Sequence, residues 1–195
     1  GNQRNGTVYA DDTARAFTLN NQTGGVIDAG LGNLGAGFSV ELLSTGNAFS
    51  IVNAGTIQGR GSADAGMGTA GDGLRFERTR VGVALDGSTT GLFTGTITNS
   101  GLIASESTNG TTAGIRFVNG VSFRGVLNNS GTISGTQNGL YFGNSVTAGG
   151  ADHTGGIVNN LAAGTISSTS RAFNIDGVGL VINNAGRIIG TGNQR

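Results

Sequence analysis

The residues ITNSGLIAS at positions 97–105 contain the motif that decides the fold, which reads apolar-x-Asn-x-Gly-x-Ile. The same motif recurs as IVNAGTIQG at 51–59, VLNNSGTISG at 126–135 and VINNAGRIIG at 181–190. Two longer copies, TLNNQTGGVIDA at 18–29 and IVNNLAAGTISS at 157–168, carry two extra residues between the Asn and the Gly. Self-similarity at intervals of a few tens of residues indicates a repeat architecture.

A second pattern, apolar-x-Phe, lies between successive copies of the motif. It appears as GLRFER at 73–78, GIRFVNG at 114–120 and GLYFGN at 139–144, with looser versions at 14–21, 37–42 and 170–177. In both patterns apolar and polar residues alternate over short runs bounded by Gly, Asn, Ser and Thr, which is typical of β-strands. The sequence therefore predicts two or three strands in each repeat and no helix.

A strand repeat of this length cannot bury its apolar face alone, but it can when stacked on copies of itself. We therefore predict an all-β parallel β-helix, or β-solenoid, with right-handed coiling and about six coils stacked ~4.8 Å apart. Alternate residues then point inward. We expect Phe17, Phe93 and Phe123, each eight residues before a motif Gly, to form one interior column. The motif isoleucines are expected to form another: Ile57, Ile103, Ile133, Ile166 and Ile188.

The Asn and Gly of the motif are predicted to turn the corner of each coil. Gly adopts positive φ without strain, and Asn tolerates the left-handed region and bonds to nearby backbone groups. Asn residues at one offset from their Gly also predict a stacked amide ladder. The predicted corner residues are Asn53, Gly55, Asn99, Gly101, Asn129, Gly131, Asn184 and Gly186.

The first four residues, GNQR at 1–4, are identical to the last four at 192–195. If the two segments coincide in successive copies, the period is 191 residues and the next motif Gly follows Gly186 by 30 residues, a spacing already present in the chain. We therefore predict that residues 1–195 are a single repeat unit of a tandem array, whose partners are adjacent copies joined end to end. Two polar stretches, near 60–73 and 149–156, are predicted to be loops that project from the coils.

Composition excludes several classes of protein. The chain has 39 Gly without any Pro, which argues against collagen, and it has no Cys for disulfides or thiolate metal sites. Eleven basic and eleven acidic residues balance, so there is no electrostatic footprint for nucleic acid or an anionic membrane. No stretch approaches the ~20 apolar residues of a membrane span. We expect no cofactor and no membrane insertion of this segment.

Asp11 and Glu41 are the best candidates for catalysis, because both lie fourteen residues before a motif Gly and can stack one coil apart. Two carboxylates ~5–9.5 Å apart can act as acid and base on a glycosidic bond. The alternative is a pair of solvated corner residues that bind a nearby Arg. His153, the only histidine, is interpreted as an exposed loop residue, since the adjacent Asp152 would point to the opposite face of a strand. We expect no catalytic residues.

Calcium binding is a further possibility, because secreted β-rolls bind this ion through Gly- and Asp-rich nonapeptides. Asp64 and Asp72, in the stretch 60–73, would be the ligands together with backbone carbonyls. The nonapeptide does not recur in this sequence, however. We therefore expect no metal site.

The repeats resemble those in the passenger regions of Gram-negative autotransporters and related large adhesins. The resemblance rests on the pattern N-S-G-x-I-x-[SG], followed some ten residues later by G-[IL]-x-F. NSGLIAS at 99–105 and NSGTISG at 129–135 are the closest matches. This resemblance implies secretion through the outer membrane and display on the bacterial cell surface.

The function expected from these features is that of a structural, extracellular stalk or filament that supports adhesion or matrix assembly. Its partners would be adjacent copies, with lateral fibre contacts or surface glycans as further candidates. An alternative is an adhesin module that itself binds glycans or a host surface. A third is a polysaccharide-degrading β-helix enzyme, which would require Asp11 and Glu41 to share a cleft.

Overall fold

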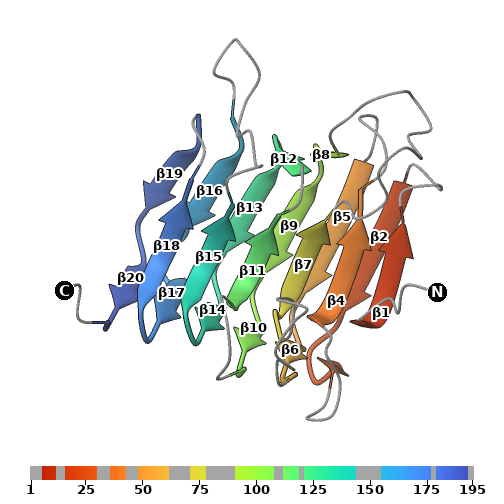
Figure 1. The fold of residues 1–195 in the computed structure, drawn as a ribbon, viewed down its shortest axis with the longest axis horizontal. Coiled ribbons are helices and arrows are strands. Elements are labelled where there is room, and N and C mark those ends of the chain that lie inside the picture. Colours follow the sequence, from red (N-terminus) through yellow and green to blue (C-terminus); the bar gives the residue numbers. More distant parts are fainter. Residues whose placement is uncertain are drawn as a thin grey trace.

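The computed structural model describes residues 6–11, 16–29, 36–42, 48–61, 71–77, 91–107, 112–118, 121–143, 155–176 and 179–192. Every regular element in these residues is a β-strand. The described strands form three six-stranded sheets, called here the front, back and base sheets, and one two-stranded pair (Figure 1). All pairings are parallel, as the period-two alternation and the repeat predicted.

The strands enter the three sheets in strict rotation along the chain. The front sheet contains β1 (Gly6–Asp11), β4 (Ala36–Glu41), β7 (Leu74–Glu77), β11 (Ala113–Phe117), β15 (Asn138–Phe142) and β18 (Arg171–Ile175). The back sheet contains β2 (Ala16–Asn21), β5 (Ala48–Asn53), β9 (Thr96–Asn99), β13 (Val126–Asn129), β16 (Ile157–Asn160) and β19 (Val181–Asn184). The base sheet contains β3 (Val26–Asp28), β6 (Thr56–Gly59), β10 (Leu102–Ser105), β14 (Thr132–Gly135), β17 (Thr165–Ser168) and β20 (Arg187–Gly190).

Each passage from front to back to base is one coil, and the described residues make six of them. Coil 1 is β1–β2–β3, coil 2 is β4–β5–β6, coil 5 is β15–β16–β17 and coil 6 is β18–β19–β20. Coils 3 and 4 each contain a fourth strand, β8 (Gly91–Phe93) or β12 (Val121–Phe123), which pair with each other. The predicted parallel β-helix of about six coils is thus confirmed, whereas its right-handedness stays a prediction.

The motif isoleucines form one continuous column inside the base sheet. Register places Ile57, Ile103, Ile133, Ile166 and Ile188 opposite one another on successive strands, and Ile27 extends the column into coil 1. The four in coils 2 to 5 are fully buried. Ile188 is 39% exposed because coil 6 has a neighbouring coil on one side only.

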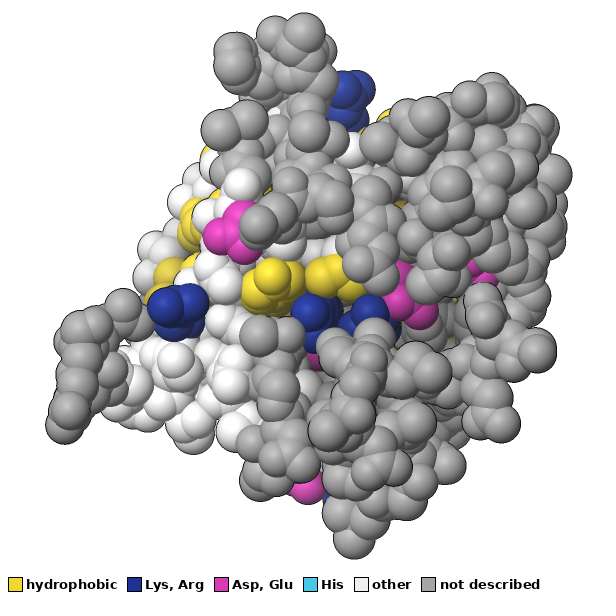
Figure 2. All heavy atoms as spheres, in the orientation of Figure 1, with side chains coloured by type: hydrophobic (Ala, Val, Ile, Leu, Met, Phe, Trp, Pro, Cys, Tyr) yellow, Lys and Arg dark blue, Asp and Glu magenta, His cyan; other side chains and the backbone are white. Residues whose placement is uncertain are grey.

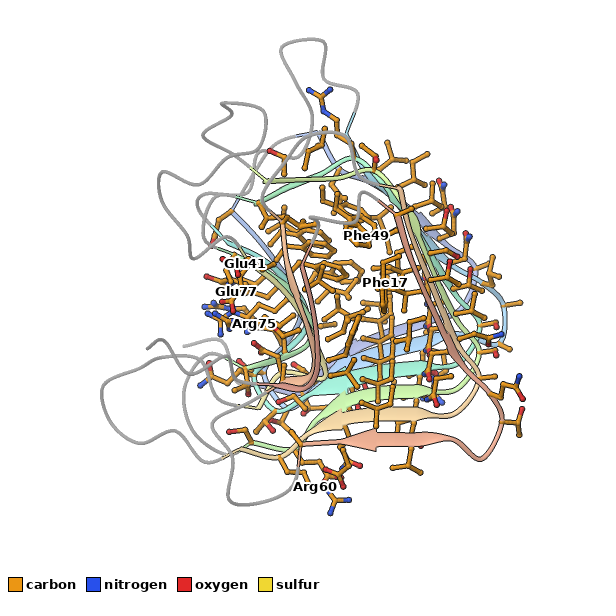
Figure 3. All side chains as sticks on the ribbon, turned by 90° about the vertical axis from the view of Figure 1, so that its right-hand side faces the viewer. Phe17, Glu41, Phe49, Arg60, Arg75 and Glu77 are labelled. Carbon is orange, nitrogen blue, oxygen red and sulfur yellow. The ribbon has the colours of Figure 1, made fainter. Side chains whose placement is uncertain are left out.

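Two columns of aromatic rings fill the rest of the interior. Phe17, Phe49, Phe93 and Phe123 stack from the back side, with successive ring centroids 6.3, 6.1 and 5.7 Å apart. Phe76, Phe117 and Phe142 stack from the front sheet at 4.5 and 5.2 Å. The columns touch, since Phe117 lies 4.7 Å from Phe123. Figure 3, a view down the axis along which the coils stack, shows Phe17 and Phe49 pointing into this core.

Phe49 was not among the residues predicted for the first aromatic column. It lies six residues before Gly55, whereas the predicted members lie eight residues before their glycines. Pairing of β2 with β5 nevertheless aligns Phe49 with Phe17. Register thus aligns Phe17 with Phe49, and separately Phe93 with Phe123 on β8 and β12.

Candidate functional site

The corner between the back and base sheets contains a ladder of asparagine side chains. Each ladder Asn is the last residue of its back-sheet strand, and its Nδ2 donates to Oδ1 of the Asn in the next coil at 2.7–2.8 Å. The members, in order, are Asn21, Asn53, Asn99, Asn129, Asn160 and Asn184. Those in coils 2 to 5 are almost wholly buried. We call this row the inner ladder.

Each inner amide also donates to backbone carbonyls at the corner. The Nδ2 of Asn129 lies 3.2 Å from the carbonyl of Gly131 in its own coil and 3.2 Å from that of Thr165 in the next. The Gly131 carbonyl also accepts a backbone bond from Thr165 N, and the carbonyl of Asn99 accepts bonds from the amides of Ser130 and Gly131. Buried polar groups need such partners, so the ladder satisfies the buried amides and adds to the backbone bonds that hold the turn.

Asn21 and Asn160 belong to the ladder although the sequence placed only Asn53, Asn99, Asn129 and Asn184 in it. In their two longer repeats the extra residues form a hydrogen-bonded turn, with Gly25 N donating to Gln22 O and Gly164 N to Leu161 O. The turn lies beyond the strand end, so it changes the distance from Asn to Gly without shifting the Asn. Counting from the strand instead of from the Gly would have found both residues.

The motif glycines are required by close packing and not by positive φ, which corrects the reason predicted from the sequence. Among the described glycines only Gly24, Gly71 and Gly179 have positive φ. A Cβ atom on Gly101 would lie 2.1 Å from the carbonyl oxygen of Gly55, one coil earlier. Equivalent clashes, at 2.2 Å, meet a Cβ on Gly55, Gly131 or Gly186. The stacked corners leave no space for a side chain.

A second, outer row of asparagines lies on the solvent face of the back sheet. Asn159 Nδ2 donates to Asn128 Oδ1 at 2.8 Å, and Asn183 Nδ2 donates to Asn159 Oδ1 at 2.9 Å. We call this row the outer ladder; the motif analysis did not identify it. Its donors belong to the later coil, whereas the donors of the inner ladder belong to the earlier coil.

The front sheet bears a cluster of charged side chains on its outer face, visible beside apolar side chains in the middle of Figure 2. Arg75 donates from Nη1 to Asp72 at 2.8 Å and from Nε to Glu77 at 2.7 Å. Arg116, opposite Arg75 on the next strand, lies 3.9 Å from Asp72, and its guanidinium carbon is 4.9 Å from the centre of the Tyr141 ring. Figure 3 shows Arg75 and Glu77 together outside this sheet.

Burial and ion pairing act in opposite directions on Arg75, which is only 3% exposed. Removal from water alone would lower its pKa, but the charges and hydrogen bonds of Asp72 and Glu77 outweigh that cost and raise the pKa above its ordinary value. Arg75 therefore stays charged. Asp72, fully buried, also accepts a 2.8 Å bond from the backbone amide of Ala113, which ties coil 3 to coil 4.

The structure places Asp11 and Glu41 opposite each other on β1 and β4, one coil apart. Each is the last residue of its strand, and Glu41 is 2% exposed, so the alternative of a solvated residue is wrong for Glu41. The side chain of Asp11 lies outside the described residues, as do Asp64, Asp152 and His153. Asp72, considered above as a calcium ligand, is bound by Arg75.

The two predicted loops fall largely outside the described residues. At the start of the first, Arg60 Nε lies 3.4 Å from Asp28 and 3.3 Å from Glu106, and Nη2 donates to Gln58. These contacts link coils 1, 2 and 3 along the surface. Partly exposed ion pairs of this kind contribute about 0–1 kcal/mol each.

In comparisons with known proteins, no family model matches this chain, and no curated protein or solved structure matches it. The resemblance to autotransporter passengers therefore rests on the sequence motifs. No described segment forms an apolar helix of membrane-spanning length. Within the same residues, no group of three or more His, Cys, Asp or Glu side chains is arranged to hold a metal ion.

Replacing Asn129 by Ala is expected to lower the free energy of unfolding by about 3 kcal/mol or more. The change removes the acceptor of Asn99 and the donor to Asn160 in a buried corner, where each unsatisfied group costs about 1–3 kcal/mol. Asn128→Ala is the matched control on the outer row, with an expected loss below about 1 kcal/mol. Denaturant unfolding measures both, and equal losses would contradict the distinction between the two ladders.

Two substitutions, Gly101→Asn and Gly24→Asn, test whether Gly is required for lack of space or for its backbone conformation. Asn tolerates the left-handed region, so it should fit Gly24, whose φ is +81° and which has open space around its Cβ position. At Gly101 it would collide with the Gly55 carbonyl and cost about 3 kcal/mol or more. Unfolding midpoints provide the comparison. A tolerated Gly101→Asn would contradict the explanation by close packing.

Arg75→Leu is expected to destabilise the fold by about 3–5 kcal/mol, because it leaves the Asp72 carboxylate buried without its main cationic partner. Adding Asp72→Asn to that variant should recover part of the loss. Because the pKa of Arg75 is raised, its contribution in the wild type is present at every pH below its ordinary value and is lost only in more alkaline solution. Unfolding at pH 6 and pH 9 should therefore give the same Arg75→Leu penalty.

Proposed function

We propose that this chain is one unit of an extracellular β-solenoid stalk or filament on the bacterial surface. In this proposal the last coil of one unit pairs with the first coil of the next, so that strand pairing and the inner ladder continue through the array. The GNQR segments at 1–4 and 192–195 support the 191-residue period. Localisation rests on the resemblance to autotransporter passengers.

The observation that carries the proposal is the open edge of coil 6. Its strands are the last of all three sheets, and the inward-facing Ile182 and Ile188 are 38% and 39% exposed. One coil earlier, Val158 and Ile166 occupy the same positions and are fully buried. A further coil in the same register would bury this apolar surface, at about 25 cal/mol per Å², and pair the open strand edges.

Coil 1 presents the matching edge at the opposite end of the rod, where Figure 1 shows β1 and β2, and where β3 ends the base sheet. Phe17, Leu19 and Ile27 point inward but are only partly buried. These three side chains continue the same columns as Phe49, Ile51 and Ile57 in coil 2. Both ends of the unit therefore expose the same kind of surface.

The back sheet also suits a structural fibre. None of its six strands contains a charged residue, and its outer face carries Thr, Ser, Asn and β-branched aliphatic side chains. Such a face does not repel an identical neighbour, so stalks can lie side by side.

A chain of two units joined through one shared GNQR segment tests the proposal. Stability in stacked repeats grows with each interface between neighbours, so the two-unit chain should unfold at a higher denaturant concentration than the single unit. Cryo-electron microscopy should show one rod whose ~4.8 Å rungs continue through the junction.

The control is a two-unit chain with Ile182→Asp and Ile188→Asp in the first unit, which places charges at the end of the apolar core. It should unfold at the midpoint of the single unit. Two separate particles, and an unchanged midpoint for the unmodified two-unit chain, would refute end-to-end continuation.

A further inference from the structure

The residue type in the outer row of the back sheet changes from coil to coil, whereas the inner row has Asn in all six coils. In coil order its members are Asn20, Val52, Thr98, Asn128, Asn159 and Asn183. Asparagine therefore occupies coils 4, 5 and 6, where the outer ladder forms, and then reappears in coil 1. There Asn20 lies opposite Val52 and has no amide opposite it in the next coil.

We infer that Asn20 of a second copy of this chain extends the outer ladder, because it lies next to Asn183 when coil 1 of that copy docks on coil 6. The inference rests on the proposed end-to-end stacking and adds a side-chain contact that strengthens this junction. Asparagine would then run without interruption through coils 4, 5, 6 and 1. The amide ladder would extend across the junction between copies.

The hydrogen-bonding directions of the two ladders fit this junction. In coil 6, Asn184 presents Nδ2 toward the open edge, because inner donors belong to the earlier coil, while Asn183 directs its Nδ2 back to Asn159. In coil 1, Asn21 uses its Nδ2 toward Asn53, which leaves Oδ1 on the open side. Asn184 would thus donate to Asn21 of the second copy, and Asn20 of that copy would donate to Asn183.

The positions of two charged residues also favour the pairing of coil 6 with coil 1 of another copy. Asp28 in coil 1 and Arg187 in coil 6 are the only charged residues in the strands of the back and base sheets. In register, β20 of one copy would place Arg187 beside Val26 of the next and diagonal to its Asp28. A diagonal neighbour on the adjacent strand is within reach of a long side chain.

The outer row adds a contact to the junction beside that of the inner row. In the three six-stranded sheets the strands of coils 2 to 5 are paired on both sides, so coils 1 and 6 hold the open edges. At a junction in register, Asn183 meets Asn20 in the outer row while Asn184 meets Asn21 in the inner row.

Self-association of the 195-residue chain, measured by sedimentation over a range of concentrations, tests this inference. The double variant Asn20→Asp/Asn183→Asp places two carboxylates on adjacent rungs across the junction and should weaken association about tenfold or more. Added salt should restore part of it. Asn20→Asp/Asn183→Lys places opposite charges there and should associate at least as well as the wild type.

The matched control is Val52→Asp/Thr98→Asp, which adds the same two charges on adjacent rungs of the same row but inside the unit. Its association should equal that of the wild type. Circular dichroism and unfolding midpoints establish that each variant is folded.

The outcomes separate this inference from the stalk proposal. If the wild type associates and the double Asp variant associates equally well, the role of the outer ladder is refuted while end-to-end stacking stands. A wild type that remains monomeric up to millimolar concentration also overturns the inference, and the two-unit chain then decides the stalk proposal independently.

Discussion

The corner between the back and base sheets is the constraint on which the rest of the structure depends. Coils stack at the spacing of paired strands, and at the corner this spacing brings a Gly Cα so near the carbonyl of the preceding coil that no Cβ fits. Backbone bonds between coils continue through the corner, where Leu102 N donates to Gly55 O. The asparagine amide, with two donor hydrogens and one carbonyl, adds a bond to the Asn of the next coil and further donors to the corner carbonyls, so the same arrangement recurs from coil to coil.

This corner also sets the register of the core. The motif Ile follows its Asn by four residues in the tight copies, so a fixed Asn places Ile57, Ile103 or Ile133 in the interior column. A slip of one residue would turn every side chain of the strand to the opposite face. Variation in length is accommodated elsewhere: consecutive inner asparagines are between 24 and 46 residues apart, yet the ladder distances stay within 0.1 Å of one another.

The features that the sequence predicted correctly are those that recur. The strand type, the number of coils and the isoleucine column follow from one motif repeated at fixed offsets, because parallel stacking turns equal offsets into contact. Asn160 was missed because its offset was measured from the Gly, beyond a turn of variable length. Phe49 was missed because it lies on a back-sheet strand, whereas Phe93 and Phe123 lie on the separate strands β8 and β12. The pair Asp72 and Arg75 was missed for another reason: it occurs in one coil, and nothing periodic indicates it.

The two asparagine rows have different roles: the inner row stabilises every coil in the same way, and the outer row makes coils different from one another. A residue needed by every corner, such as Asn99 or Asn129, must be the same in every coil and so cannot distinguish one coil from another. A solvent-facing position is under no such demand, and Val52, Thr98 and Asn128 differ there although their strands pair in the same register. Positional information in a stack of near-identical coils therefore resides where the coils differ, in the outer row and in features of a single coil such as the buried pair of Asp72 and Arg75.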